Sequence, residues 1–311
     1  MTTATPQLIQ AALQQLNAVI LGKEHTVKLA LTCLLADGHL LLEDLPGMGK
    51  TTLAHALAQV CGLEYQRVQF TSDLLPADLI GASIFEPANG NFRFHQGPLF
   101  SQVVLADELN RATPKAQSAL LEAMEEQQVS VDRQTYQLPQ PFFVIATQNP
   151  QSQSGTFPLP ESQLDRFLLR ISLGYPDPLA EREMLKGRNG RSLLSSLKPV
   201  LNPNRLQGLQ SLVPQVKLSD TLLDYVQRLI AYTRQSEECH LGLSPRGAQA
   251  LVRSAQSWAL LQGRTHVLPE DVQAVFAAVA GHRLVGRHET QGEQLARHIL
   301  SKVDVIGSRH V

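Results

Sequence analysis

The sequence predicts an α/β domain built on a parallel sheet, followed by a domain made of helices. Three observations support this prediction. A glycine-rich loop at residues 46–49 joins an apolar strand to a helix. Apolar strands and helices then alternate as far as residue 171, which is typical of a parallel sheet covered by helices. Beyond residue 177 only helical periodicity remains. We therefore expect an α/β domain over residues 1–176 and a helical domain over residues 177–311.

The strand, loop and helix at residues 39–52 have the order of a phosphate-binding loop. Glycines let backbone N–H groups turn around an anion, and the N-terminus of the helix adds partial positive charge. Lys50 is expected to reach the β- and γ-phosphates of a nucleotide, and the Thr51 hydroxyl to hold Mg²⁺. In the pattern G-x-x-x-x-G-K-[ST] the first glycine falls on Asp44, whose carboxylate is harmless if it points away or caps a neighbouring N–H. The alternative is a chance Gly-Lys-Thr sequence in a turn.

Polar residues follow two further apolar strands. Residues 102–106 lead into Asp107 and Glu108. Beside a phosphate loop, Asp107 is expected to hold the Mg²⁺ shell and Glu108 to polarise the attacking water. Residues 142–146 lead to Asn149, which is placed to orient that water or contact the γ-phosphate, because ligands bind at the carboxyl ends of parallel strands. The alternatives are an acidic strand end at the surface and a turn asparagine.

Two arginines are candidates for contacts with phosphate. Arg246 lies in the first turn of a helix that is capped by Ser244, where a cation opposes the helix dipole and therefore suggests a second partner such as a phosphate. Arg166 lies at the junction between a short helix and a strand. The alternatives are a solvated side chain at position 246 and, at position 166, a surface ion pair with Asp165 or Glu161.

The segment before the phosphate loop and two later segments have other expected roles. Two amphipathic helices joined at Gly22 precede the loop, in a place from which they can close over an adenine base. By themselves they are only a helix pair. Residues 84–94, with the turn signal Asn89-Gly90, and residues 129–138 are predicted to form β-hairpins that project from the nucleotide-binding core.

The composition is that of a globular protein. Hydrophobic residues make up 43% and charged residues 18% of the 311 positions. The net charge of −1 argues against a protein built mainly to coat nucleic acid. The three cysteines have neither metal-ligand nor redox spacing, so we expect buried thiols in a reducing compartment. The sequence shows no signal peptide and no apolar run that could span a membrane, and it therefore predicts a cytoplasmic protein.

Five separated motifs, in one order, resemble AAA+ ATPases of the MoxR type. They are the phosphate loop and residues 105–112, 148–150, 157–167 and 243–246. The resemblance implies the following roles: Walker A for Lys50 and Thr51, Walker B for Asp107 and Glu108, sensor 1 for Asn149, sensor 2 for Arg246 and, for Arg166, an arginine finger that acts on a neighbouring subunit. The residues expected around ATP are Gly22, Pro46, Gly47, Met48, Gly49, Lys50, Thr51 and Thr52, with Thr51 and Asp107 holding Mg²⁺.

The resemblance also implies an all-helical lid and a ring of subunits, usually a hexamer. Members of the family resemble chaperone-like machines that mature partner proteins or insert metals or cofactors, often partners with a von Willebrand factor A-type domain, and a separate adaptor is expected. A nucleic-acid motor or loader is the alternative. The second hairpin offers only Arg133 as a cation, whereas a grip on DNA requires several. A nucleotide switch without turnover is disfavoured by the presence of Glu108 and Arg166.

Overall fold

The computed structural model describes residues 4–87, 90–149, 155–187, 190–287 and 292–306. At its centre is a five-stranded parallel sheet with the strand order β2-β5-β8-β1-β9. Its strands are β1 (Leu40–Glu43), β2 (Tyr65–Gln69), β5 (Val103–Asp107), β8 (Phe143–Gln148) and β9 (Leu169–Ile171). The predicted α/β domain is thus confirmed. Because β1, β5 and β8 are neighbours and parallel, their carboxyl ends meet at one edge of the sheet.

Both faces of the sheet are buried, which explains why its strands are apolar almost throughout. Leu40 and Leu105 point into one hydrophobic cluster, whereas the next residues, Leu41 and Ala106, point into a second. The helices that share the first cluster include α1 (Ala4–Val19), α2 (Glu24–Leu35) and α3 (Lys50–Val60). The second cluster is shared by α4 (Pro76–Ile80) and α5 (Pro114–Glu126).

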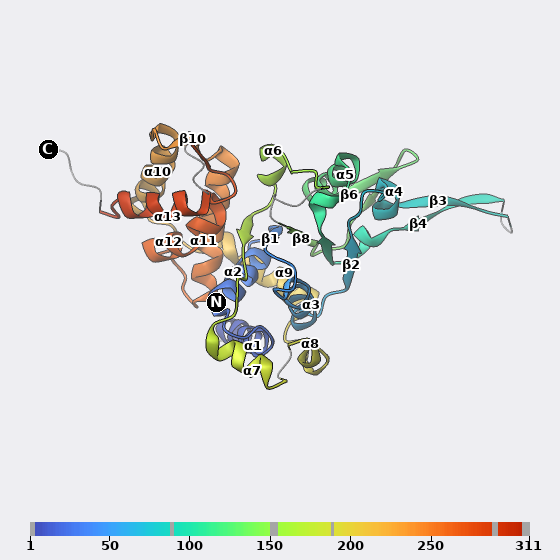
Figure 1. The fold of residues 1–311 in the computed structure, drawn as a ribbon, viewed down its shortest axis with the longest axis horizontal. Helices are drawn as coiled ribbons and strands as arrows, with labels where there is room; N and C mark the ends of the chain where they lie inside the picture. Colours follow the sequence, from blue (N-terminus) through green and yellow to red (C-terminus); the bar gives the residue numbers. More distant parts are fainter. Residues whose placement is uncertain (1–3, 88–89, 150–154, 188–189, 288–291, 307–311) are drawn as a thin grey trace.

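Two antiparallel hairpins leave this core, as predicted. The first, made of β3 (Gly81–Glu86) and β4 (Asn91–Gln96), is the long arm at the right of Figure 1. It extends beyond the predicted residues 84–94. In its predicted turn, Gly90 has a φ of +65°, whereas Asn89 lies outside the described residues.

The second hairpin consists of β6 (Gln128–Val131) and β7 (Gln134–Gln137). Its turn residues, Asp132 and Arg133, both have positive φ, as the favoured two-residue hairpin turn requires. The ring of Phe94 in the first hairpin stacks on Tyr136 in the second, with 4.3 Å between the ring centroids. The two hairpins therefore support each other at their bases.

Helices dominate the chain after residue 177, which confirms the predicted lid. After the short α6 (Glu161–Leu164) they are α7 (Pro178–Leu185), α8 (Gly190–Leu193), α9 (Pro203–Leu212), α10 (Asp220–Gln235), α11 (Pro245–Leu261), α12 (Pro269–Ala280) and α13 (Gly292–Lys302). The region also holds one short antiparallel pair, β10 (Cys239–Leu241) with β11 (Val285–Gly286). Such short strands cannot show the alternation that identifies a strand in sequence.

Helix α8 packs against α1 and α9 against α2, whereas α10 to α13 form the group at the left of Figure 1. The N–H groups of Val200 and Leu201 donate to the Val60 carbonyl at the end of α3, at 2.8 and 3.1 Å. The predicted division at residue 176 stays a prediction. All three cysteines are buried and free, as expected. Within the described ranges, no helix combines the length and the apolar character needed to cross a membrane.

Candidate active site

The phosphate loop connects β1 to α3, and its glycines adopt conformations that favour glycine. Gly47 and Gly49 have φ values of +84° and +92°. A Cβ added to either residue would find open space within 4 Å, so the loop leaves room beside its backbone for a ligand. Pro46 is exposed and Met48 is half-buried. The half-buried Thr51 and Thr52 stand in the first turn of α3.

Lys50 begins helix α3 and is buried, with its side chain beneath the loop. Its Nζ donates to the backbone carbonyls of Asp44 at 2.5 Å and Leu45 at 3.1 Å. Burial lowers the pKa of Lys50, and the nearby carboxylates of Asp44, Asp107 and Glu108 oppose that shift. In the described part of the chain, no carboxylate forms an ion pair with this ammonium group. An anion bound at the loop would therefore find a desolvated positive charge.

Asp107 and Lys50 line the same cavity of about 520 Å³, together with Thr51, Glu108 and Asn149. The Asp107 side chain is buried at the carboxyl end of β5. Its Oδ1 accepts from the Thr147 hydroxyl at 2.6 Å, and its Oδ2 accepts from the Arg67 guanidinium, with the shorter bond also at 2.6 Å. The carboxylate is thus held in one orientation at the edge of the cavity.

Glu108 follows with a left-handed backbone, φ +57°, which is uncommon for a residue with a side chain and is frequent at functional sites. The Thr147 hydroxyl accepts from the Glu108 N–H at 2.8 Å and stabilises this conformation. The Glu108 carboxylate accepts from the amides of Asn149 at 3.0 Å and Gln69 at 2.8 Å, and from Arg111 at 3.0 Å. The structure therefore brings together Lys50, Asp107, Glu108 and Asn149, as the sequence predicted.

The donor set of this cavity fits Mg²⁺. Thr51 and Asp107 both line the cavity and supply a hydroxyl and a carboxylate oxygen, which are ligands suited to this hard cation. Among the described residues, no group of three or more His, Cys, Asp or Glu converges as a metal site. An ion held here would take its other ligands from phosphate oxygens and water, as Mg²⁺ usually does.

A second cavity, of about 220 Å³, lies on the other side of the loop and is here called the base cavity. It shares Gly47, Gly49 and Thr52 with the phosphate side. The rest of its lining is mainly apolar and consists of Val19, Ile20, Leu21, Lys23, Met48, Leu173, Gly174, Pro176, Met184 and Gly190. Mainly apolar walls next to a phosphate loop suit a nucleotide base.

Gly22 lies between two lining residues of the base cavity and has a φ of +67°. A Cβ on Gly22 would collide with the side chains of Asp177 and Ala180. The segment made of α1, α2 and their connection is here called the leader. Glycine is required at position 22 for close packing of the leader on α7, in addition to any contact with a base.

Arg166 and Arg246 lie elsewhere. Together with Gly38 and His39, which precede β1, they line a separate cavity of about 240 Å³. The phosphate loop follows the same strand at its other end. Arg166 binds Glu125 at 3.0 Å, and Arg246 binds the other oxygen of that carboxylate. Within one chain, Arg246 therefore does not share a cavity with Lys50, because packing of the lid places the start of α11 at the opposite edge of the sheet.

The segment that carries Arg166 is anchored to the lid. Arg283, which is buried, donates to the Asp165 carboxylate at 2.6 Å and to the Phe167 carbonyl at 2.7 Å. The Ser244 hydroxyl also donates to Asp165, at 3.0 Å. Because Asp165 and Phe167 flank Arg166, the lid determines where this arginine is presented.

Arg67, Gln69 and Thr147 contact the two acids, and none of them was predicted from the sequence. Arg67 and Gln69 are two residues apart on β2 and therefore share one face of that strand. Two long polar side chains on one face were a possible signal. Their role depends on β2 lying beside β5, with Gln69 opposite Asp107, and that pairing is not visible in the sequence.

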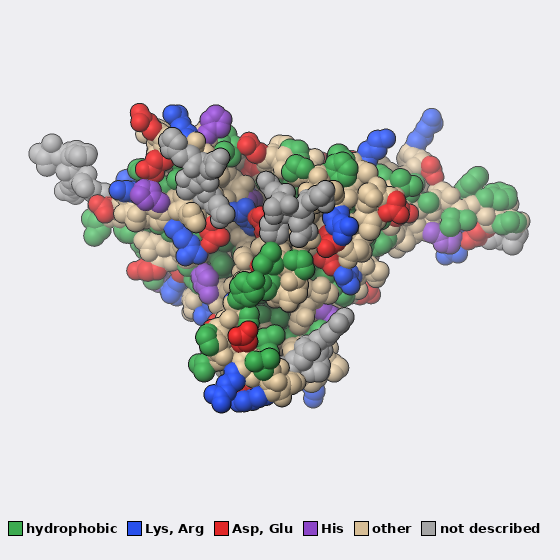
Figure 2. All heavy atoms as spheres, in the orientation of Figure 1, with side chains coloured by type: hydrophobic (Ala, Val, Ile, Leu, Met, Phe, Trp, Pro, Cys, Tyr) green, Lys and Arg blue, Asp and Glu red, His purple; other side chains and the backbone are tan. Residues whose placement is uncertain are grey.

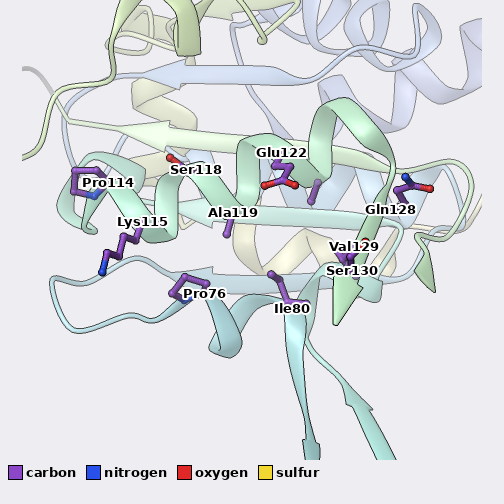
Figure 3. A pocket seen from close by; sticks show the side chains of 11 residues that line it. Pro76, Ile80, Pro114, Lys115, Ser118, Ala119, Glu122, Gln128, Val129 and Ser130 are labelled. Atoms are coloured by element: carbon purple, nitrogen blue, oxygen red, sulfur yellow. The ribbon is translucent and has the colours of Figure 1, made fainter. Parts of the chain in front are cut away.

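A further hollow of about 540 Å³ lies between α4, α5 and β6 (Figure 3). Figure 3 shows Pro76 and Ile80 facing Ala119 across it. Its lining includes one basic residue, Lys115, and one acidic residue, Glu122. These lining residues do not form a glycine-rich anion cradle, so we do not assign the nucleotide to this hollow.

Comparison with known proteins agrees with this geometry. Residues 39–169 match the ATPase family associated with various cellular activities (AAA), and residues 231–303 match the AAA lid domain. The fold and the site thus define an AAA+ ATPase.

Relatives of known sequence narrow the class. The uncharacterized protein YeaC of Bacillus subtilis is 44% identical over 96% of this chain and 95% of its own length. Chaperone MoxR1 of Mycobacterium tuberculosis is 38% identical over 94% of this chain and 79% of its own length. A crystal structure from Cytophaga hutchinsonii has a TM-score of 0.86 at 35% identity, covering 96% of this chain and 95% of that one. The chain belongs to the MoxR family of AAA+ ATPases.

Proposed function

We propose that this chain hydrolyses ATP, with Mg²⁺, at interfaces between identical subunits of a ring. One observation supports the proposal: two clusters of candidate site residues lie at opposite ends of β1. Lys50 and Glu108 lie at the carboxyl end, and Arg166 and Arg246 lie at the amino end. A head-to-tail contact between copies would join one cluster to the other, and such contacts close into rings. The family resemblance favours a hexamer.

Within one subunit, the site residues have distinct roles. Lys50 and the N–H groups of the loop would hold the β- and γ-phosphates. Glu108, oriented by Asn149 and Gln69, would accept the proton of the attacking water. Mg²⁺, held by Thr51 and Asp107, would supply neutralisation of the phosphate oxygens.

The neighbouring subunit would supply Arg166 and Arg246. Positive charge at the γ-phosphate stabilises the transition state of phosphoryl transfer. In the single chain both guanidinium groups are bound to Glu125. When a nucleotide binds to the neighbouring subunit, the two guanidinium groups would have to leave the Glu125 carboxylate or contact both this carboxylate and the phosphate. Both arginines therefore act in trans in this proposal.

We assign the energy of hydrolysis to the remodelling of partner proteins. The chaperone name of the Mycobacterium tuberculosis relative supports this, as does the surface of the β3–β4 arm. Figure 2 shows hydrophobic side chains gathered along that arm. Phe85 is 50% and Phe92 73% exposed, and their ring centroids are 5.3 Å apart. Exposed aromatic pairs of this kind favour contact with apolar segments of a protein.

The nucleic-acid alternative has less support from the same arm. Binding to single strands requires a row of cations beside aromatic side chains. Arg93 on β4 lies 3.5 Å from Glu86, which partly neutralises it. A partner with a von Willebrand factor A-type domain, a separate adaptor and a cytoplasmic location all stay predictions.

A mixing experiment tests the shared site. Subunits with Lys50→Ala lack a working phosphate loop, and subunits that carry both Arg166→Ala and Arg246→Ala lack the trans arginines. Each variant alone is expected to be nearly inactive, whereas a mixture should regain activity at interfaces that combine the two intact clusters. In the matched control, a subunit with the single change Arg297→Ala takes the place of the subunit with Arg166→Ala and Arg246→Ala. Arg297→Ala removes an exposed ion pair with Glu293 on α13. Absence of recovery in the mixture, with both variants folded and assembled, would contradict the proposal.

A further inference from the structure

We infer that Asp44 is a positioning residue that ties the phosphate loop to the wall of the base cavity, so that its carboxylate supports binding of the base and is not required for binding of the phosphates. The inference rests on the nucleotide binding proposed above. Asp44 occupies the position at which the general phosphate-loop pattern has a glycine.

The Asp44 carboxylate is buried and points away from the loop's phosphate side. Its Oδ2 accepts from the N–H groups of Leu173 at 2.6 Å and Gly174 at 2.8 Å, and from the Ser172 hydroxyl at 3.1 Å. Its Oδ1 accepts from the N–H of Leu45 at 3.1 Å. Four donors thus surround one charge, which is the arrangement that stabilises a buried carboxylate.

The strand pairing explains why an acceptor is needed at this position. β1 and β9 pair in parallel from Leu40 opposite Leu169 to Leu42 opposite Ile171. Beyond that point the β9 chain turns, and Gly174 adopts a φ of +61°. The N–H groups of Leu173 and Gly174 therefore need another acceptor, and the Asp44 side chain supplies it. A glycine at position 44 would leave them without this acceptor.

The two residues held by Asp44 are part of the base cavity. Leu173 and Gly174 line it, and Pro176 follows two residues later. A second tether reaches the same segment, because the Lys23 ammonium donates to the Tyr175 carbonyl. The wall is thus fastened on one side to the phosphate loop and on the other to the leader that supplies Leu21 and Lys23.

The phosphate side takes only a backbone hydrogen bond from Asp44, and the carboxylate acts on Lys50 through its charge alone. Lys50 donates to the Asp44 carbonyl oxygen, and any residue at this position offers that atom. Loss of the carboxylate should therefore release the wall of the base cavity and leave the cradle of Gly47, Gly49 and Lys50 in place. This separation distinguishes a positioning role from a general contribution to folding.

The test compares a ligand that has a base with one that lacks it. We would measure binding of a fluorescent ADP and its competition by inorganic tripolyphosphate, for the wild type, Asp44→Gly and Asp44→Asn. For Asp44→Gly we expect the affinity for the fluorescent ADP to fall about tenfold or more, as for buried N–H groups that lose a charged acceptor. The affinity for tripolyphosphate should not fall, because the variant removes a negative charge near Lys50 and keeps the backbone cradle. Asp44→Asn keeps one acceptor oxygen, so its affinity for the fluorescent ADP should lie between those of the wild type and Asp44→Gly.

The controls keep this inference separate from the function on which it rests. Ser172→Ala removes only the hydroxyl donor and should bind both ligands nearly as the wild type does. Thermal unfolding would reveal whether Asp44→Gly fails to fold. In that case Asp44→Asn still tests the inference. Equal losses for both ligands, or none for either, would overturn the inference about Asp44. A wild-type protein that binds neither ligand would instead overturn the proposed nucleotide site.

Discussion

Arg166 and Glu125 form an ion pair in which Nη2 lies 3.0 Å from Oε2. Arg246 occupies the other oxygen of the same carboxylate. One acidic side chain near the end of α5 thus holds both arginines that the proposed mechanism requires at a neighbouring nucleotide. The γ-phosphate of that nucleotide and the Glu125 carboxylate would compete for the same two guanidinium groups.

This competition predicts the effect of Glu125→Gln. The variant should need a lower protein concentration than the wild type for half-maximal ATPase activity, because the arginines no longer have to leave a negative charge. Both arginines and Glu125 are about one-third to one-half exposed, so each pair contributes about 1 kcal/mol or less. A shift of a few-fold is therefore expected, and ATPase activity against protein concentration measures it.

Glu293→Gln is the matched control for this prediction. It removes an ion pair with Arg297, at 2.8 Å on α13, that is more exposed than the Glu125 pairs. Its concentration dependence should equal that of the wild type. If Glu125→Gln instead requires more protein, Glu125 orients the arginines in the assembled ring, and competition is the wrong description.

Glu108→Gln should separate binding from turnover. The amide keeps the size of the side chain but cannot take a proton, so we expect normal ATP binding and loss of most hydrolysis. Because ATP would stay bound, partner proteins should be retained on the ring. Co-purification from native cell extract with and without ATP, and with half of each sample treated with nuclease, measures this.

The outcome of that capture distinguishes the two uses of the ATPase. A defined protein recovered only with ATP supports remodelling. Nucleic acid that is recovered with ATP and lost on nuclease treatment would favour the motor or loader. The arm supplies a matched variant, Phe92→Ser, which should weaken recovery of a protein partner and leave ATP hydrolysis unchanged.

Thr147→Val tests the support of the two acids. The hydroxyl donates to Asp107 and accepts from the Glu108 N–H, and the residue is fully buried. Its loss should cost about 1–3 kcal/mol of stability, because two buried polar groups lose their partner. Misplacement of both acids should also lower kcat by at least about tenfold. Denaturant unfolding measures the loss of stability, and steady-state kinetics measure the fall in kcat.

A buried threonine of the lid provides the comparison for Thr147. The Thr233 hydroxyl donates to the Ile230 carbonyl at 2.7 Å and accepts from the Leu243 N–H at 3.1 Å, and it is also fully buried. Thr233→Val should therefore lose similar stability yet retain most of kcat. Equal kinetic effects in the two variants would show that Thr147 has no special role at the acids.

His39 makes stability depend on pH. Its Nδ1 accepts from the Val144 N–H and its Nε2 donates to the Met124 carbonyl, both at 3.1 Å, so the folded protein holds the neutral ring. Burial lowers the pKa of His39 to about 4. Below about pH 6.5 the imidazole binds a proton in the unfolded chain but not in the folded protein. The free energy of unfolding therefore falls as the pH drops toward 4.

The measurement compares free energies of unfolding at pH 7 and pH 5. The wild type should lose about 2 kcal/mol more than His39→Gln over this interval. His240→Gln, at an exposed position, should keep the dependence of the wild type. The same loss in the wild type and in His39→Gln would assign the dependence to other groups.

The sequence by itself determined the class of fold and the half of the site at the carboxyl edge of the sheet. Lys50, Asp107, Glu108 and Asn149 each follow an apolar run that identifies a strand end. In a parallel sheet such ends share one edge, so local patterns were enough to bring these residues together. The hairpins were also predictable, because turn residues and alternation are local signals.

Only the tertiary structure decided what depends on contacts between distant segments. The strand order placed Arg67 and Gln69 of β2 beside the acids. The docking of the lid placed Arg246 with Arg166 on Glu125, at the edge opposite Lys50. The path of the chain after β9 gave the Asp44 carboxylate three of its four donors, which lie 128 to 130 positions away in sequence. These side chains have their roles through neighbours that no local pattern can specify.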